Sequence, residues 1–140
     1  MVLRGEALSE TGRERLALMR ETQDGFRIAE AMDTAQRGMG IDWPTARELI
    51  DRVLIEAKSR PDADLACGVG TDHLPPGPAS LGEILDAYRQ QADAVERHGG
   101  RMILMASRAL AASAKGPEDY LTLYTTLIDE AADKVILHWL

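Results

Sequence analysis

DLACGVG, residues 64–70, is a short run that begins with an acidic residue, continues with small and apolar residues, and is followed by polar residues. Three other runs have the same length and character: FRIAEAM at 26–32, RMILMAS at 101–107 and KVILHWL at 134–140. Short apolar runs separated by helix-length segments are typical of βα units around a parallel sheet. The sequence therefore predicts four strands, each buried on both faces and joined by helices.

The segments between these runs carry the apolar spacing and the end signals of helices. Asp42 and Pro44 mark the start of one helix, whose buried stripe is Ala46, Leu49, Ile50, Val53, Leu54 and Ala57. Ser80 and Glu83 have the spacing of a capping box, and the stripe that follows is Leu81, Ile84, Leu85, Tyr88, Ala92 and Val95. Residues 98–100 end that helix, and Pro117 opens the last one. A weaker pattern predicts a further helix over 9–22.

Two architectures fit four parallel strands with intervening helices. One is an open, doubly wound sheet; the other, which we favour, is part of a (β/α)8 barrel, since a whole barrel takes roughly 250 residues. We expect a single partial barrel domain over 1–140, with a helix in 1–24 and three βα units plus a final strand in 25–140. The strand pattern is cut before a barrel would close. Its open edges favour pairing in a homo-oligomer or with a complementing half-barrel.

Composition excludes several classes of function. The chain has 140 residues, of which 45% are hydrophobic and 28% charged, and its net charge is −7, so no nucleic-acid partner is expected. No segment reads as a membrane span or signal peptide, and the single Cys67, expected to be a small buried residue, suits a cytoplasmic protein. The GVGT segment at 68–71 lacks the remaining residues of a dinucleotide or P-loop motif, so no cofactor is expected. Close packing or a turn is the expected role of Gly68 and Gly70.

Polar residues follow each predicted strand, where parallel α/β proteins place their functional groups. Asp33 is a candidate base, metal ligand or helix cap, and Asp72-His73 a candidate acid/base pair of which one member faces the site. His138 is either a satisfied core residue or a site residue. Arg37 and Arg108 are either carboxylate clamps or solvated loop residues.

A metal site at this rim is an alternative. The residue types are suitable for oxygen and nitrogen coordination, although no local ligand spacing supports it; the candidate ligands are Asp33, Asp72, His73 and His138.

Four segments, AEAMDTAQRGMGIDWP at 29–44, CGVGTD at 67–72, ILMASRAL at 103–110 and VILHWL at 135–140, resemble an uncharacterised bacterial family related to dihydrodipicolinate synthase. The wider superfamily includes N-acetylneuraminate lyase. Its members are (β/α)8 barrels that make or break carbon–carbon bonds through a Schiff base between a lysine and pyruvate or another 2-keto acid. The resemblance implies an aldolase or lyase acting on a small keto acid.

Residue by residue, the resemblance implies that Thr34 binds the keto-acid carboxylate and that His138 stands where the superfamily has a proton-relaying tyrosine. The lysine nucleophile would lie on a strand beyond residue 140. Of the lysines present, Lys58 and Lys134 lie at the wrong end of the strands, and Lys115 is expected to be exposed. We therefore expect this chain alone to be catalytically incomplete.

The site predicted from the sequence has two groups of residues. His138 and Asp33 are the catalytic candidates, and substrate binding is assigned to Thr34, Thr71, Asp72, Ser107 and Arg108. Two alternatives stay open: a non-catalytic half-barrel that forms homodimers through its sheet edges, and a metal-dependent α/β enzyme that uses the Asp/His rim.

Overall fold

The computed structural model describes residues 28–32, 37, 40–60, 63–133 and 135–139, in which strands and helices alternate. The strands are β1 (Ile28–Glu30), β2 (Leu65–Val69), β3 (Arg101–Met105) and β4 (Ile136–His138). The helices are α2 (Trp43–Ala57), α3 (Leu81–Glu96), α4 (Arg108–Ser113) and α5 (Pro117–Glu130). The helix predicted over 9–22, within the segment 1–24, lies outside the described residues.

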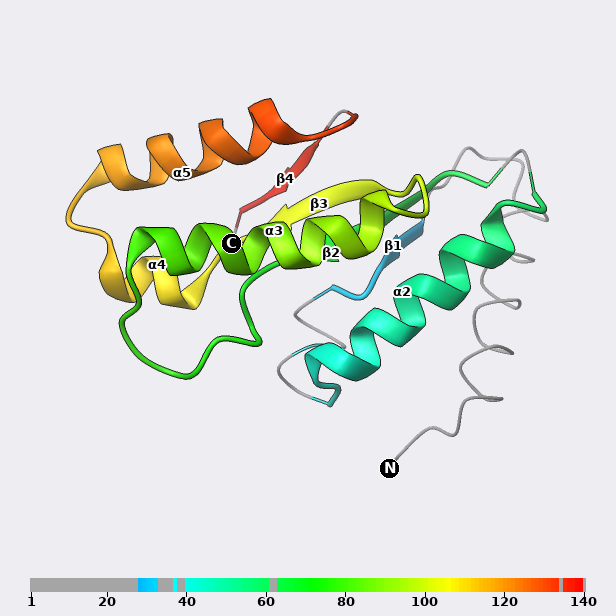
Figure 1. Ribbon diagram of the computed structural model, residues 1–140, viewed down its shortest axis with the longest axis horizontal. Helices are drawn as coiled ribbons and strands as arrows, with labels where there is room; N and C mark the ends of the chain where they lie inside the picture. Colours follow the sequence, from blue (N-terminus) through cyan, green and yellow to red (C-terminus); the bar gives the residue numbers. More distant parts are fainter. Residues whose placement is uncertain (1–27, 33–36, 38–39, 61–62, 134, 140) are drawn as a thin grey trace.

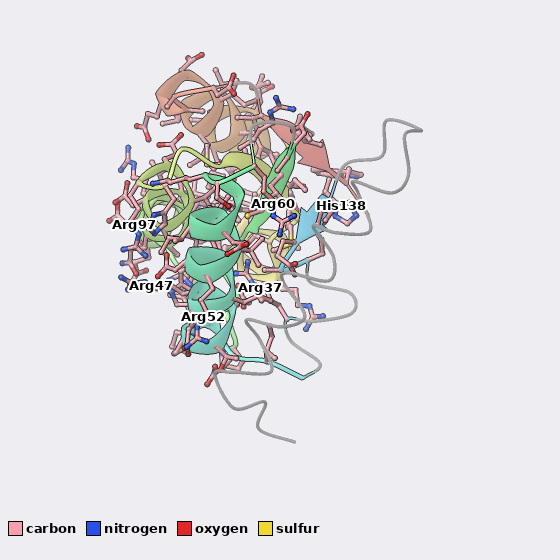
Figure 2. The ribbon with its side chains drawn as sticks, turned by 90° about the vertical axis from the view of Figure 1, so that its right-hand side faces the viewer. Arg37, Arg47, Arg52, Arg60, Arg97 and His138 are labelled. Atoms are coloured by element: carbon pink, nitrogen blue, oxygen red, sulfur yellow. The ribbon has the colours of Figure 1, made fainter. Side chains whose placement is uncertain are left out.

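The strands form one sheet in the order β1-β2-β3-β4, and every neighbouring pair is parallel (Figure 1). A doubly wound sheet would reverse its strand order at a switch point, whereas a barrel adds strands sequentially. Seen from the side, the helices lie together on one side of the strands (Figure 2). The predicted class is confirmed: an α/β fold with four parallel strands alternating with helices, consistent with part of a (β/α) barrel.

The predicted helix ends are largely confirmed. Asp42 accepts a hydrogen bond from the backbone N–H of Thr45, at 3.0 Å, and so begins α2. Ser80 and Glu83 form both bonds of a capping box at the start of α3. The short helix α4 was not predicted. Its signal is a capping serine, Ser107, followed by the alanine-rich residues 109–112.

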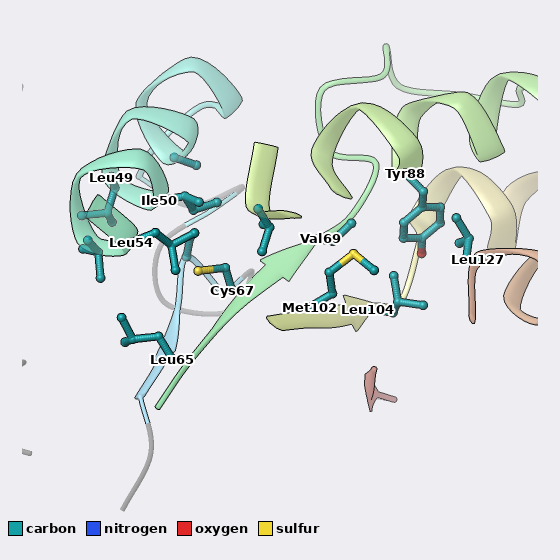
Figure 3. Packing of buried hydrophobic residues seen from close by; sticks show 14 of the residues in the cluster. Leu49, Ile50, Leu54, Leu65, Cys67, Val69, Tyr88, Met102, Leu104 and Leu127 are labelled. Carbon is teal, nitrogen blue, oxygen red and sulfur yellow. The ribbon is translucent and has the colours of Figure 1, made fainter. Parts of the chain in front are cut away.

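Alternate strand residues face the helices and form the core (Figure 3). Leu65, Cys67 and Val69 of β2 and Met102 and Leu104 of β3 pack against apolar stripes of the helices, all at 6% exposure or less. Each fully buried side chain of this size contributes about 1.5–3 kcal/mol to stability. The helix stripes read from the sequence are therefore what holds the helices on this face.

The opposite face of β2 carries only the small residues Ala66 and Gly68, and Gly70 follows directly after the strand. A Cβ at Gly68 would lie 2.5 Å from the carbonyl oxygen of Ala31, and one at Gly70 would lie 3.1 Å from the Met105 methyl group. The predicted role of these glycines in close packing is confirmed. Their lack of side chains lets Ala31 approach Gly68 and the Arg37 guanidinium approach Gly70.

Burial of all four strands on both faces was predicted, and this is wrong for β1, where Ala29 is exposed, and for β4. Ile136, Leu137 and Trp139 are 43%, 56% and 67% exposed. The reason is that the described residues leave these side chains largely uncovered; β4 also pairs with β3 along one edge, and none of the described residues pairs with its other edge. Trp139 makes edge contacts with the rings of Tyr120 and Tyr124 on α5.

Candidate functional site

A hollow of about 290 Å³ opens at the C-terminal ends of β2 and β3. Thr71 and Asp72 reach it from the loop after β2, and Arg108 reaches it from the first turn of α4. The rest of its lining is Arg37, Gly70, Pro76, Gly77, Met105 and Ala106. A second and more open hollow, of about 690 Å³, shares Asp72 and is lined otherwise by His73 and residues 40–44.

Arg37 is the central cation of this region, and it is only 1% exposed. Its guanidinium holds Asp72 in two hydrogen bonds, with Nε 3.1 Å from Oδ2 and Nη2 on Oδ1. Nη1 donates to the carbonyl oxygen of Gly68 at 2.7 Å, and the guanidinium carbon lies 5.1 Å from the ring centre of Trp43. Arg37 is therefore not a solvated loop residue, and the carboxylate that it clamps is that of Asp72. Its donors are used within the protein.

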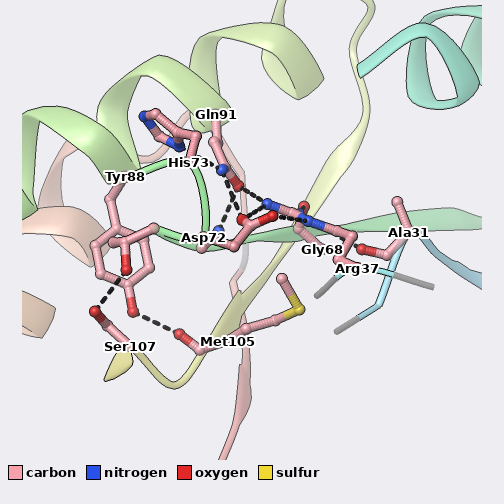
Figure 4. A network of polar contacts seen from close by, with 11 residues as sticks. Ala31, Arg37, Gly68, Asp72, His73, Tyr88, Gln91, Met105 and Ser107 are labelled. Atoms are coloured by element: carbon pink, nitrogen blue, oxygen red, sulfur yellow. Dashed lines mark hydrogen bonds and ion pairs between the residues drawn. The ribbon is translucent and has the colours of Figure 1, made fainter. Parts of the chain in front are cut away.

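Gln91 on α3 connects the groups around Arg37 (Figure 4). Its Oε1 accepts from the backbone N–H of Gly70 at 2.7 Å and from Nη2 of Arg37. Its Nε2 lies 2.9 Å from Oδ1 of Asp72 and 2.8 Å from Nδ1 of His73. Asp72 and His73, predicted to point apart, both contact this nitrogen because the chain turns after Thr71 instead of staying extended.

The two ionisable groups have shifted pKa values. Partial burial alone would raise the pKa of Asp72, but the hydrogen bonds from Arg37 and Gln91 outweigh it and hold the pKa below its ordinary value. Burial lowers the pKa of His73, and the charge of Asp72 only partly offsets this. At neutral pH, Asp72 is therefore an anion and His73 is uncharged.

Thr71 and Ser107 join the ends of β2 and β3 through a hydrogen bond of 2.6 Å between their hydroxyl groups. Both residues are buried, and Ser107 Oγ also accepts from the backbone N–H of Leu110. Ser107 thus connects Thr71 to the first turn of α4, and Thr71 itself lines the hollow. Arg108 is exposed, and its side chain makes no hydrogen bond or ion pair with any residue that the structure describes.

The remaining predicted site residues are placed differently. His138 pairs in the sheet with Met105, a residue of the hollow, and lies on the side of the sheet away from α2 (Figure 2). Its Nδ1 is buried and has no hydrogen-bond partner among the described residues. Asp33 and Thr34 lie outside the described residues. The structure thus brings Thr71, Asp72 and Arg108 together, with Ser107 behind them and His138 on the neighbouring strand end.

Neither a metal site nor a Schiff-base lysine is formed at the hollow by the described residues. They include no group of three or more His, Cys, Asp or Glu side chains placed to hold a metal ion. Lys58 and Lys115 are both exposed, as predicted for Lys115, and neither lines the hollow. Within the part of the chain that is described, no helix is long and apolar enough to cross a membrane.

Gln91 is the residue that the sequence interpretation missed. It lies three residues after Tyr88 and seven after Ile84, so it occupies the buried stripe of α3 and is itself 0% exposed. A polar residue at a core position of an amphipathic helix needs hydrogen-bond partners. The spacing of Gln91 from Ile84 and Tyr88 therefore indicated a buried polar residue.

Comparison with known proteins gives a family match for most of the chain. Residues 12–140 match the model of the family described as "Protein of unknown function (DUF993)". Among curated proteins, the comparison found no match.

Proposed function

The chain belongs to the DUF993 family of proteins of unknown function, and we propose that the hollow beside Thr71 and Arg108 binds the carboxylate of a small 2-keto acid such as pyruvate. In this proposal the protein is part of an aldolase- or lyase-type barrel. The described chain supplies the binding groups and no Schiff-base lysine.

The charge balance of the hollow carries the proposal. Arg37 neutralises Asp72 within their ion pair, and among the described residues nothing neutralises the exposed guanidinium of Arg108, which lines the hollow together with Thr71. A local positive charge is notable in a chain whose net charge is −7. A guanidinium binds a carboxylate through paired, charge-assisted hydrogen bonds, and Met105, Ala106 and Pro76 offer an apolar wall to the rest of a small ligand.

The acid/base roles are proposed on different grounds. At the strand end next to Met105, His138 has a buried Nδ1 that no described residue contacts by a hydrogen bond, and an imidazole so placed is suited to proton transfer. Asp33, as a second acid/base group, and Thr34, as a carboxylate ligand, enter the proposal from the sequence alone.

A buried free thiol at Cys67 suits a reducing compartment such as the cytoplasm.

Ligand-observed NMR with ¹³C-labelled pyruvate tests the binding step. We expect binding to the native chain and at least tenfold weaker binding to Arg108→Gln, since a hydrogen bond to a charged group contributes about 1.5–3 kcal/mol. The matched control is Arg47→Gln, which removes an exposed arginine from α2 and leaves the hollow unchanged. Equal binding by both variants would overturn the proposal. Borohydride treatment with pyruvate should give no covalent adduct on this chain.

A second proposal concerns the partner of the chain. The exposed apolar side chains of β4, on an edge that no described residue pairs with, favour a homodimer or a complementing half-barrel. Solution mass measurement tests the homodimer: we expect twice the monomer mass for the native chain and the monomer mass for Leu137→Lys. A native chain that is monomeric at high concentration would contradict self-association.

A further inference from the structure

The orientation of the Gln91 side-chain amide is fixed by its neighbours. The backbone N–H of Gly70 and the guanidinium of Arg37 can only donate, and both contact the same amide atom. That atom must be the oxygen. The amide nitrogen then faces Asp72 and His73, as Figure 4 shows.

This orientation dictates the protonation state of His73. The Gln91 nitrogen has two hydrogens, one directed to Oδ1 of Asp72 and one to Nδ1 of His73. Nδ1 of His73 must therefore be an unprotonated acceptor, and the imidazole is neutral with its hydrogen on Nε2.

We propose that Gln91 is a positioning residue that holds the loop of Asp72 and His73 against Arg37, and that this arrangement forms only while His73 is neutral. Adding a proton to Nδ1 of His73 would set two donors against each other at 2.8 Å. Turning the Gln91 amide would not relieve the clash, because its NH₂ group would then face the Gly70 N–H and Arg37.

The charged groups around His73 do not remove this conflict. Asp72 favours the protonated ring, but its carboxylate is held by Arg37, whose own charge opposes protonation. From α2, the Trp43 ring lies 6.0 Å from the imidazole, and Asp42 lines the same hollow while capping its helix. From α3, Gln90 and Gln91 face the ring and are uncharged.

The consequence for ligand binding rests on the proposed function. Protonation of His73 would release Gln91 from the loop that also supplies Thr71 to the hollow. Keto-acid binding should then weaken together with the titration of His73. The tautomer of His73 and its titration, by contrast, can be measured without any ligand.

Ring ¹⁵N chemical shifts of the three histidines, followed from pH 8 to pH 4 in the native chain, test the inference directly. We expect His73 to be the Nε2–H tautomer, with a titration midpoint below 6.5. The variant Gln91→Glu replaces the donor by a carboxylate oxygen, which accepts a hydrogen from Nδ1. In this variant the His73 midpoint should rise above 6.5.

Each outcome decides the question. An Nδ1–H tautomer, or a native midpoint at or above 6.5, would overturn the inference, and neither measurement needs a variant to fold. Pyruvate binding that is unchanged across the His73 titration would refute the link to the hollow. Absence of pyruvate binding at every pH would refute the proposed function and leave the role of Gln91 intact.

Discussion

Arg37 and Asp72 form a bidentate ion pair that joins the segment after β1 to the loop after β2, with the guanidinium buried and the carboxylate 26% exposed. The pair is charge-neutral, and Arg108 lines the hollow as a cation without an ion-pair partner among the residues that the structure describes. Removing one partner of a buried ion pair lowers stability more than replacing both partners by apolar residues, because the remaining charge stays buried without a partner.

Asp72→Ala should therefore lower the free energy of unfolding by about 3 kcal/mol, near the lower end of the range for buried pairs because this carboxylate is partly exposed. Urea denaturation measures the change. Asp86→Ala is the control, since it breaks an exposed pair with Arg89 and should cost about 1 kcal/mol or less. Equal losses in the two variants would contradict a central structural role for the Arg37–Asp72 pair.

Gly68→Ala should destabilise the protein by about 1–3 kcal/mol, because the new methyl group would overlap the Ala31 carbonyl oxygen 2.5 Å away and the Met105 sulfur 3.0 Å away. Gly82→Ala offers a control of opposite sign. It lies in the first turn of α3 with only the Ser80 hydroxyl group near, at 3.9 Å, so alanine should stabilise the helix by up to about 1 kcal/mol. Thermal unfolding compares the two, and a stabilising Gly68→Ala would show that the Ala31 carbonyl does not lie against Gly68.

The spacing of apolar residues was sufficient to predict the architecture, because each buried helix face and strand places apolar residues at regular intervals in the sequence. The stripe from Ala46 to Leu54 and the capping box at Ser80 are local patterns, and the structure places α2 and α3 where those patterns indicate. Exposure of β4 was not predictable in this way. The apolar residues 135–137 look the same in the sequence whether or not a neighbouring strand covers them.

The candidate site was predictable in its location but not in its contacts. Strand ends supplied Thr71, Asp72 and Arg108, since parallel strands bring their C-terminal ends to one edge. The partners of Asp72 come from 35 residues earlier and 19 residues later in the chain. Such pairings depend on how α3 and the segment after β1 pack over β2, which no local pattern encodes.

Cys67 should be nearly inert to thiol reagents in the folded protein. It is 0% exposed, and burial together with the charge of Glu30 raises its pKa to about 12, so hardly any thiolate is present at pH 8. With a disulfide reagent such as Ellman's reagent, we expect labelling at least 100-fold slower in the native chain than in denaturant. Full denaturation should release one thiol per chain, since Cys67 is the single cysteine. Rapid labelling of the native chain would mean that β2 opens readily to solvent.

Asp72 should make stability depend on pH in the acid range. Because its pKa is lower in the folded chain than the ordinary value of 3.8, the ionised carboxylate stabilises the fold fully above that value. This contribution is lost as the pH falls through the lower folded pKa, where the carboxylate is finally protonated. The difference in unfolding free energy between the native chain and Asp72→Asn, measured in urea from pH 5 to pH 2, should therefore shrink as the pH decreases. A difference that stayed constant or grew over this range would show that Arg37 and Gln91 do not favour the ionised form of Asp72.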